Sequence, residues 1–157
     1  MNTPSGRAAL DAAVAGRLGN LIKLTEQALT SVRSSALREF DLTVPQYSAM
    51  VALSYVPGAS GAQLARICAV TPQTMATVLA NLETKGLIQR TPSEVHQKVL
   101  LTRLTRSGQT LVRKADAKAR VIEDRLAGAF SEAERATLTE LLERAVTALT
   151  EGSRRPE

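Results

Sequence analysis

The order of the patterns in residues 60–105 constrains the fold of this chain more than any other feature. A short stretch with helical periodicity (61–68) is followed by a turn (69–70), and a second helical stretch begins at Thr71 and Pro72. A threonine hydroxyl can cap the free amides of a helix, and proline at the first helical position loses no hydrogen bond. We therefore expect two short helices joined by a tight turn.

The apolar positions of both stretches predict how these helices pack. In the first helix the buried face is expected to carry Leu64, Ile67 and Cys68. The second helix, predicted over 71–85, has four apolar residues at helical spacing that can pack against the first: Met75, Val78, Leu79 and Leu82. Gly86 follows as the expected stop, because glycine adopts the left-handed conformation at low cost.

Two strand-like runs complete the module. They lie at 87–91 and 99–104, and the polar residues 92–98 form the connecting tip. Helix, turn, helix and a two-stranded wing (87–104) is the order of a winged helix-turn-helix, which we place at 43–105.

The other face of the 71–85 helix suits DNA. It is small and polar, and it has no carboxylate before Glu83, as entry into a major groove requires. Gln73 and Asn81 are the best candidates for base contacts, because a carboxamide can bond adenine at two atoms. The predicted DNA-binding residues are Thr71, Gln73, Thr74, Thr77, Asn81, Lys85, Arg90, His96, Gln97 and Lys98. The candidates for phosphate contact are Lys85, Arg90, Lys98, Arg103 and Arg106.

The charge distribution points to the same region. The chain has a net charge of +5, and residues 60–114 hold eight Lys or Arg against two Glu. The basic surplus is therefore concentrated in the predicted module, which favours a polyanionic partner. A basic but merely solvated face is the alternative.

Both ends of the chain are expected to be helical. Apolar residues keep a helical period over 8–40 and over 107–151, with a capping-box signature at 131–134, and a shorter helix is predicted from Val44 to Tyr55. With aromatic residues at 3%, a mostly α-helical single domain (1–157) is expected. The apolar stripes of 8–40 and 107–151 exceed what this domain can cover, so we predict a twofold homodimer joined through them. Its recognition helices would lie roughly 34 Å apart and favour a pseudo-palindromic DNA site.

The stretch LARICAVTPQTMATVLANLETKGLIQRTPSEVHQKVLLTRLTRSG resembles the MarR family of bacterial winged helix-turn-helix transcription regulators. The resemblance implies a homodimeric regulator of transcription, most simply a repressor. Two departures stand out. Family members often carry arginines on the exposed recognition face, where this chain has Thr77 and Asn81. They also often carry Asp-x-Arg at the wing, where this chain has His96, Gln97 and Lys98.

The resemblance also implies a small phenolic or amphipathic effector that binds between the dimer helices and the DNA-binding module. In this chain the lining would draw on Arg38, Phe40, Tyr47, Met50 and Tyr55. The same residues could instead simply fill the core, and the sequence leaves both interpretations open.

The sequence gives little support to other chemistry. One histidine (His96) and one cysteine (Cys68) cannot build a histidine- or cysteine-based metal site, and no catalytic motif occurs, so we expect neither an enzyme nor a cofactor. Cys68 could make the protein a redox sensor, although a buried, inert thiol is the simpler interpretation. A further alternative is a winged-helix module whose basic face binds an acidic protein and has no DNA site of its own.

The expected location is the cytoplasm. A single cysteine allows no internal disulfide, which suits a reducing compartment. No signal peptide is visible, and no apolar run is long enough to span a bilayer. We therefore expect a soluble protein without a membrane partner.

Overall fold

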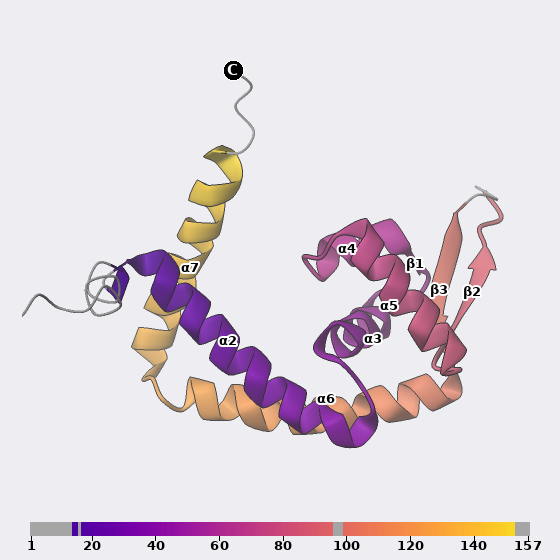
Figure 1. The fold of residues 1–157 in the computed structure, drawn as a ribbon, viewed down its shortest axis with the longest axis horizontal. Coiled ribbons are helices and arrows are strands. Elements are labelled where there is room, and N and C mark those ends of the chain that lie inside the picture. Colours follow the sequence, from indigo (N-terminus) through magenta and orange to yellow (C-terminus); the bar gives the residue numbers. More distant parts are fainter. Residues whose placement is uncertain (1–13, 16, 96–98, 153–157) are drawn as a thin grey trace, which may run out of the picture. The chain divides into compact units, whose positions relative to one another are not determined.

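The computed structural model describes residues 14–15, 17–95 and 99–152 (Figure 1). The chain divides into two compact units, Met1–Ala119 and Arg120–Glu157, and helix α6 (Arg106–Ala127) contributes to both. The predicted winged helix-turn-helix lies within the first unit. Most of the residues that the structure describes are helical.

Helix α2 (Leu18–Leu37) is shorter than the predicted helix at 8–40. Arg17 has extended backbone (φ −80°, ψ 127°), so α2 begins only at Leu18; residues 8–13 lie outside the described residues. At the other end, Arg38–Phe40 form a short 3₁₀ helix, η1, and Asp41 is left-handed with φ 52°. The left-handed residue turns the chain into the next helix, which is why the α-helical pattern stops before Phe40.

The first three helices of the winged helix-turn-helix each begin at a hydroxyl cap. In α3 (Val44–Tyr55), Gln46 N donates to Thr43 Oγ1 over 3.4 Å, and in α4 (Gly61–Ile67), Gln63 N donates to Ser60 Oγ over 3.3 Å. In α5 (Pro72–Thr84), Thr74 N donates to Thr71 Oγ1 over 3.1 Å. These caps fix where each helix starts, and the predicted start of α5 at Thr71 and Pro72 is confirmed.

The wing is a hairpin of β2 (Ile88–Pro92) and β3 (Leu100–Leu104), each within one residue of the predicted bounds. A third strand, β1 (Ala59–Ser60), pairs with the free edge of β3, so the sheet is antiparallel with the order β1-β3-β2. Two residues are too few to show strand periodicity, and β1 exists because Ala59 pairs with Thr102 across the fold.

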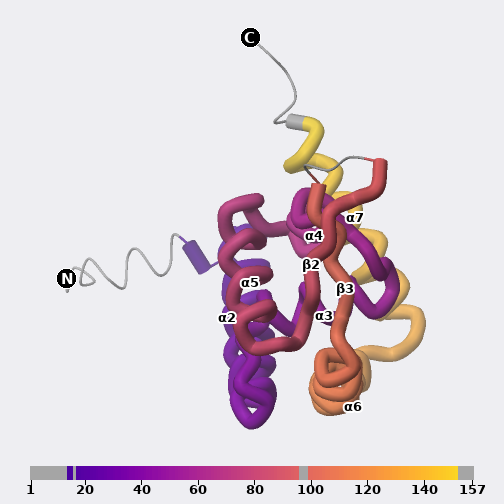
Figure 2. The backbone as a smooth tube through the Cα atoms, turned by 90° about the vertical axis from the view of Figure 1, so that its right-hand side faces the viewer, coloured from indigo at the N-terminus to yellow at the C-terminus, as the bar shows by residue number. Residues whose placement is uncertain are grey.

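The core lies between α3, α4, α5 and the first half of α6. Its largest fully buried side chains include Leu53, Leu64, Met75 and Leu82. Figure 2 shows α5 beside the β2 strand, whose Ile88 is also buried. The hydrophobic contacts of α5 therefore hold the recognition helix and the wing on one core.

The placement of Ile67 on the buried face of α4 is wrong. Its side chain is 53% exposed, and Ala65 takes the buried position beside Leu64. Ile67 lies about 200° around the helix from Ala65, so both cannot face the core. Cys68, which follows the helix, is half-buried.

The described residues after the wing form two helices, in the region 107–151 that was predicted to be helical. Helix α6 begins after Thr105, whose Oγ1 accepts a hydrogen bond from Gly108 N over 3.1 Å. Helix α7 (Glu132–Gly152) begins at the predicted capping box, where Glu134 N donates to Ser131 Oγ over 3.3 Å and Ser131 N donates to Glu134 Oε2 over 2.8 Å.

Gly108 is required by a close approach of α6 to the wing. A Cβ at this position would lie 2.0 Å from the carbonyl oxygen of Leu87. We predict that Gly108→Ala lowers the free energy of unfolding by about 1–3 kcal/mol, measured by urea unfolding. Gly19→Ala is the control, because nothing lies within 4 Å of its Cβ position. Equal stability of both variants would contradict the close approach.

Candidate nucleic-acid interface

Helix α5 has one buried and one exposed face, as the sequence predicted. Met75, Val78, Leu79 and Leu82 are buried in the core. The predicted DNA-contacting residues of the helix and its cap are all exposed: Thr71, Gln73, Thr74, Thr77 and Asn81. No carboxylate lies among them, so the face can approach DNA phosphates without repulsion.

The hydroxyl groups of this face are used differently from its carboxamides. Thr71 Oγ1 caps the helix and shares a hydrogen bond with Thr74 Oγ1 over 2.8 Å. Thr77 Oγ1 donates to the Gln73 carbonyl over 3.2 Å. Within the part of the chain that the structure describes, no hydrogen bond occupies the side chains of Gln73 or Asn81. These two carboxamides therefore keep their full capacity for base edges.

Arg90 is held by a carboxylate of the recognition helix. Its Nε donates to Glu83 Oε2 over 2.9 Å, and the Nη2 group contacts the same oxygen. These hydrogen bonds from Arg90 hold the pKa of Glu83 below its ordinary value. Arg90 therefore braces β2 against the end of α5 and would have to leave or share Glu83 to contact a phosphate.

Lys85 is also engaged within the protein. Its amine forms an ion pair with Asp41 Oδ2 at 2.9 Å and donates to the Asp41 carbonyl oxygen. Of the predicted phosphate contacts within the described ranges, Lys85 and Arg90 are thus committed to protein partners. The predicted wing-tip residues His96, Gln97 and Lys98 lie outside the described residues.

Arg103 lies on the outer face of the sheet, away from α5. It pairs across the hairpin with Gln89, whereas Arg90 alternates to the inner face. The Arg103 guanidinium lies against Gly58, where an added Cβ would approach its Nη2 to 3.2 Å. Together with Arg113 it lines a cavity of about 380 Å³ between the end of α3, the sheet and α6.

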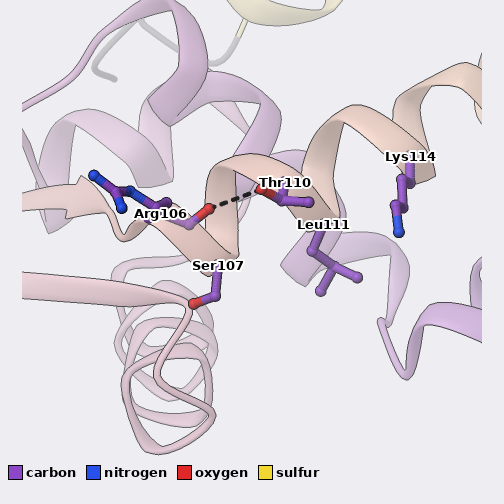
Figure 3. Close-up of a pocket in the computed structure, with 5 residues that line it drawn as sticks. All are labelled: Arg106, Ser107, Thr110, Leu111 and Lys114. Atoms are coloured by element: carbon purple, nitrogen blue, oxygen red, sulfur yellow. Dashed lines mark hydrogen bonds between the residues drawn. The ribbon is translucent and has the colours of Figure 1, made fainter.

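Arg106 lies at the start of α6. It lines a surface pocket of about 450 Å³. Figure 3 shows it with the other lining residues, Ser107, Thr110, Leu111 and Lys114. All of these lining residues come from α6, so the pocket is a groove along one helix. It is not assembled from different parts of the fold.

The predicted effector-binding residues differ in burial. Met50 is fully buried in the core, while Arg38 is exposed and Tyr55 is 75% exposed. Phe40 and Tyr47 are half-buried against the core, and the Tyr47 hydroxyl donates to Asp116 Oδ1 over 2.8 Å. Their role in binding an effector stays a prediction.

The remaining chemical candidates are limited. Burial raises the pKa of the Cys68 thiol, which disfavours the reactive thiolate and supports a structural role. Over residues 14–15, 17–95 and 99–152, no group of three or more side chains could hold a metal ion. In the same ranges no helix has both the length and the apolar character needed to cross a membrane.

Residues 40–99 match the family model for MarR. The HTH-type transcriptional repressor Rv2887 of Mycobacterium tuberculosis is 34% identical over 127 residues, which cover 81% of this chain and 91% of the relative. The chain belongs to the MarR family. Members of this family are transcriptional regulators and not enzymes, and the predicted DNA-binding transcription regulator is confirmed at this level.

Solved MarR-family structures share the fold. The crystal structure of Rv2887 matches with a TM-score of 0.63 and 32% identity, over 86% of this chain and 98% of that chain. The structure of its complex with salicylic acid matches with a TM-score of 0.65 and 33% identity, over 85% of this chain and 98% of that chain. The structure of the transcriptional repressor CouR bound to a 23-mer DNA duplex matches with a TM-score of 0.79 and 22% identity, over 87% of this chain and 96% of that chain. The predicted mostly α-helical winged helix-turn-helix is confirmed.

The Glu83–Arg90 ion pair predicts a pH dependence. Because the pKa of Glu83 is lowered in the folded protein, its contribution to stability is present at neutral pH and is lost as the pH falls through that lowered pKa. We expect the wild type to exceed Glu83→Gln in stability at pH 7, and the difference to shrink as the pH falls through the lowered pKa of Glu83. Urea unfolding at several pH values measures this difference in the free energy of unfolding.

Glu94→Gln is the matched control, because it changes an exposed carboxylate of the wing. This variant should follow the wild type across the pH range. A difference between Glu83→Gln and the wild type that did not change with pH would contradict the ion pair.

Proposed function

We propose that this MarR-family chain is a homodimeric, cytoplasmic repressor that binds a pseudo-palindromic promoter site through α5 and releases it when an effector binds. The exposed face of α5 carries the proposal. It is polar, free of carboxylates and fixed in orientation by the buried face behind it. A twofold dimer would place two such helices roughly 34 Å apart, which is one turn of DNA.

Exposed apolar side chains support the dimer. Helix α2 exposes Leu18, Leu21, Ile22 and Leu24, and helix α7 exposes Leu138, Leu141, Leu142, Val146 and Leu149. Contiguous exposed apolar side chains on a helix mark a surface that another protein surface covers. Self-association through both helices would cover them in the way that is usual for the family.

The effector is proposed to be a small amphipathic or phenolic anion. A crystal structure of Rv2887, which is 33% identical to this chain, contains salicylic acid. Phe40 and Tyr47, half-buried at the edge of the core, remain the proposed aromatic part of the site. An effector would weaken DNA binding only by its preference for a dimer arrangement that fits DNA less well.

Mutation of the two free carboxamides tests DNA recognition. We expect Gln73→Ala and Asn81→Ala each to weaken binding to a duplex from the chain's own promoter region by about 5- to 150-fold, since one bidentate base contact contributes about 1–3 kcal/mol. Binding to a scrambled duplex should not change. Fluorescence anisotropy across a salt series measures binding to each duplex. In the same assay, salicylate should release the wild-type protein from the promoter duplex.

Gln89→Ala is the matched control, because this carboxamide lies on the outer face of the sheet opposite Arg103. It should bind DNA as the wild type does. Equal, weak and steeply salt-dependent binding of the wild type to both duplexes would contradict the proposal.

A charge on the apolar face of α7 tests the dimer. Leu142→Asp is expected to yield a monomer in light scattering at micromolar concentration, because an unpaired carboxylate would be buried at the interface. The control Thr147→Asp places the same charge about 140° away around the helix. Loss of the dimer in both variants, or in neither, would contradict an interface on this face.

A further inference from the structure

We infer that Lys85 is a positioning residue: it holds the C-terminal end of the recognition helix against the connector between α2 and α3, and it does not contact DNA phosphate. The connector is defined here as residues 38–43. The inference rests on the proposed function, because it concerns how α5 is oriented for DNA.

Lys85 has little capacity left for DNA. It caps α5, with its backbone N donating to the Asn81 carbonyl over 3.1 Å. Its side chain is 32% exposed, and the amine contacts both a carboxylate oxygen and the carbonyl oxygen of Asp41. A lysine amine has three donors, so these two contacts leave one. A phosphate approaching that donor would also meet the Asp41 carboxylate, 2.9 Å from the amine.

The backbone of Asp41 is held in place, while its side chain is 94% exposed. It adopts a left-handed conformation, and its backbone N donates to the Arg38 carbonyl over 3.1 Å. Leu37 and Leu42 on either side are 1% and 5% exposed and belong to the core. The connector is therefore held by buried residues before and after Asp41. The contact between Lys85 and Asp41 then fixes the end of α5 relative to the connector.

The connector is also bound on its other side. Glu39 forms an ion pair with Lys118 of α6, and the Tyr47 hydroxyl of α3 bonds Asp116 of the same helix. The end of α2, the end of α5 and the middle of α6 thus meet at one short segment. A shift of α2 must carry Lys85 with it or break its contact with Asp41.

A set of variants separates positioning from phosphate contact. We expect Lys85→Met and Asp41→Asn each to weaken binding to the promoter duplex several-fold, with the double variant no weaker than Lys85→Met, because both remove one contact. The slope of log affinity against log salt should not change, nor should binding to a scrambled duplex. Asparagine tolerates left-handed backbone, so Asp41→Asn keeps the turn.

A phosphate contact predicts the opposite pattern and would overturn the inference. Lys85→Met would then lower the salt slope by about 0.9 and weaken binding to both duplexes. Asp41→Asn would tighten binding to both, since it removes a negative charge and frees the amine. Lys114→Met, which removes an exposed lysine of α6, is the control for the loss of a charge alone.

Hydrogen exchange of the free protein separates this inference from the proposed function. If the contact orders the connector, the amides of Leu42 and Gly86 should exchange faster in Lys85→Met and Asp41→Asn than in the wild type and in Lys114→Met. Unchanged exchange would overturn the inference even if DNA binding holds. Faster exchange in the two variants, together with a wild-type protein that does not distinguish the two duplexes, would instead refute the proposed function alone.

Discussion

Burial of one face of α5 is the constraint on which the rest of the DNA-binding module depends. Met75, Leu79 and Leu82 lie in the core, and each such side chain contributes about 1.5–3 kcal/mol by leaving water. Rotating the helix would expose them, so its outward face is fixed by packing. The side chains of Gln73 and Asn81 are exposed and lie outside the core, so they can serve DNA recognition.

The electrostatics of the module are more restrained than its composition suggests. Residues 60–114 hold a net surplus of six positive charges, yet Lys85 and Arg90 both have carboxylate partners within the protein. Each cation that neutralises a DNA phosphate steepens the salt dependence of binding, and a cation already paired does so less. This supports the proposal that specific binding rests more on polar contacts from α5 than on a dense array of charges.

Local signals explain what the sequence predicted well. Hydroxyl residues before a helical period placed the start of α5, and the capping box at Ser131 placed the start of α7. A cap is formed by residues three apart in the chain, so its signal is contained in a short window. The positive φ of Gly86 follows from the same kind of local rule.

Contacts between distant residues explain what was missed. Strand β1 depends on Thr102, and the partner of Lys85 lies 44 positions earlier in the chain; no local pattern carries either. Arg90 was an intermediate case. It shares the inner face of β2 with the buried Ile88, and strand alternation alone could have indicated that it faces α5 and Glu83 instead of solvent.

The end of α5 concentrates the geometry on which DNA binding depends. The part-buried pair of Glu83 with Arg90 adds to stability, whereas the exposed pair of Lys85 with Asp41 contributes little to it and is proposed to matter for orientation. Glu83 holds β2 of the wing, and Lys85, two positions later, holds the connector that follows α2. The end of α5 is therefore in contact both with the wing and with the connector that follows α2, one of the helices proposed to form the dimer. An effector that displaced the connector would alter both DNA-facing elements without touching either, provided that it bound the displaced arrangement more tightly.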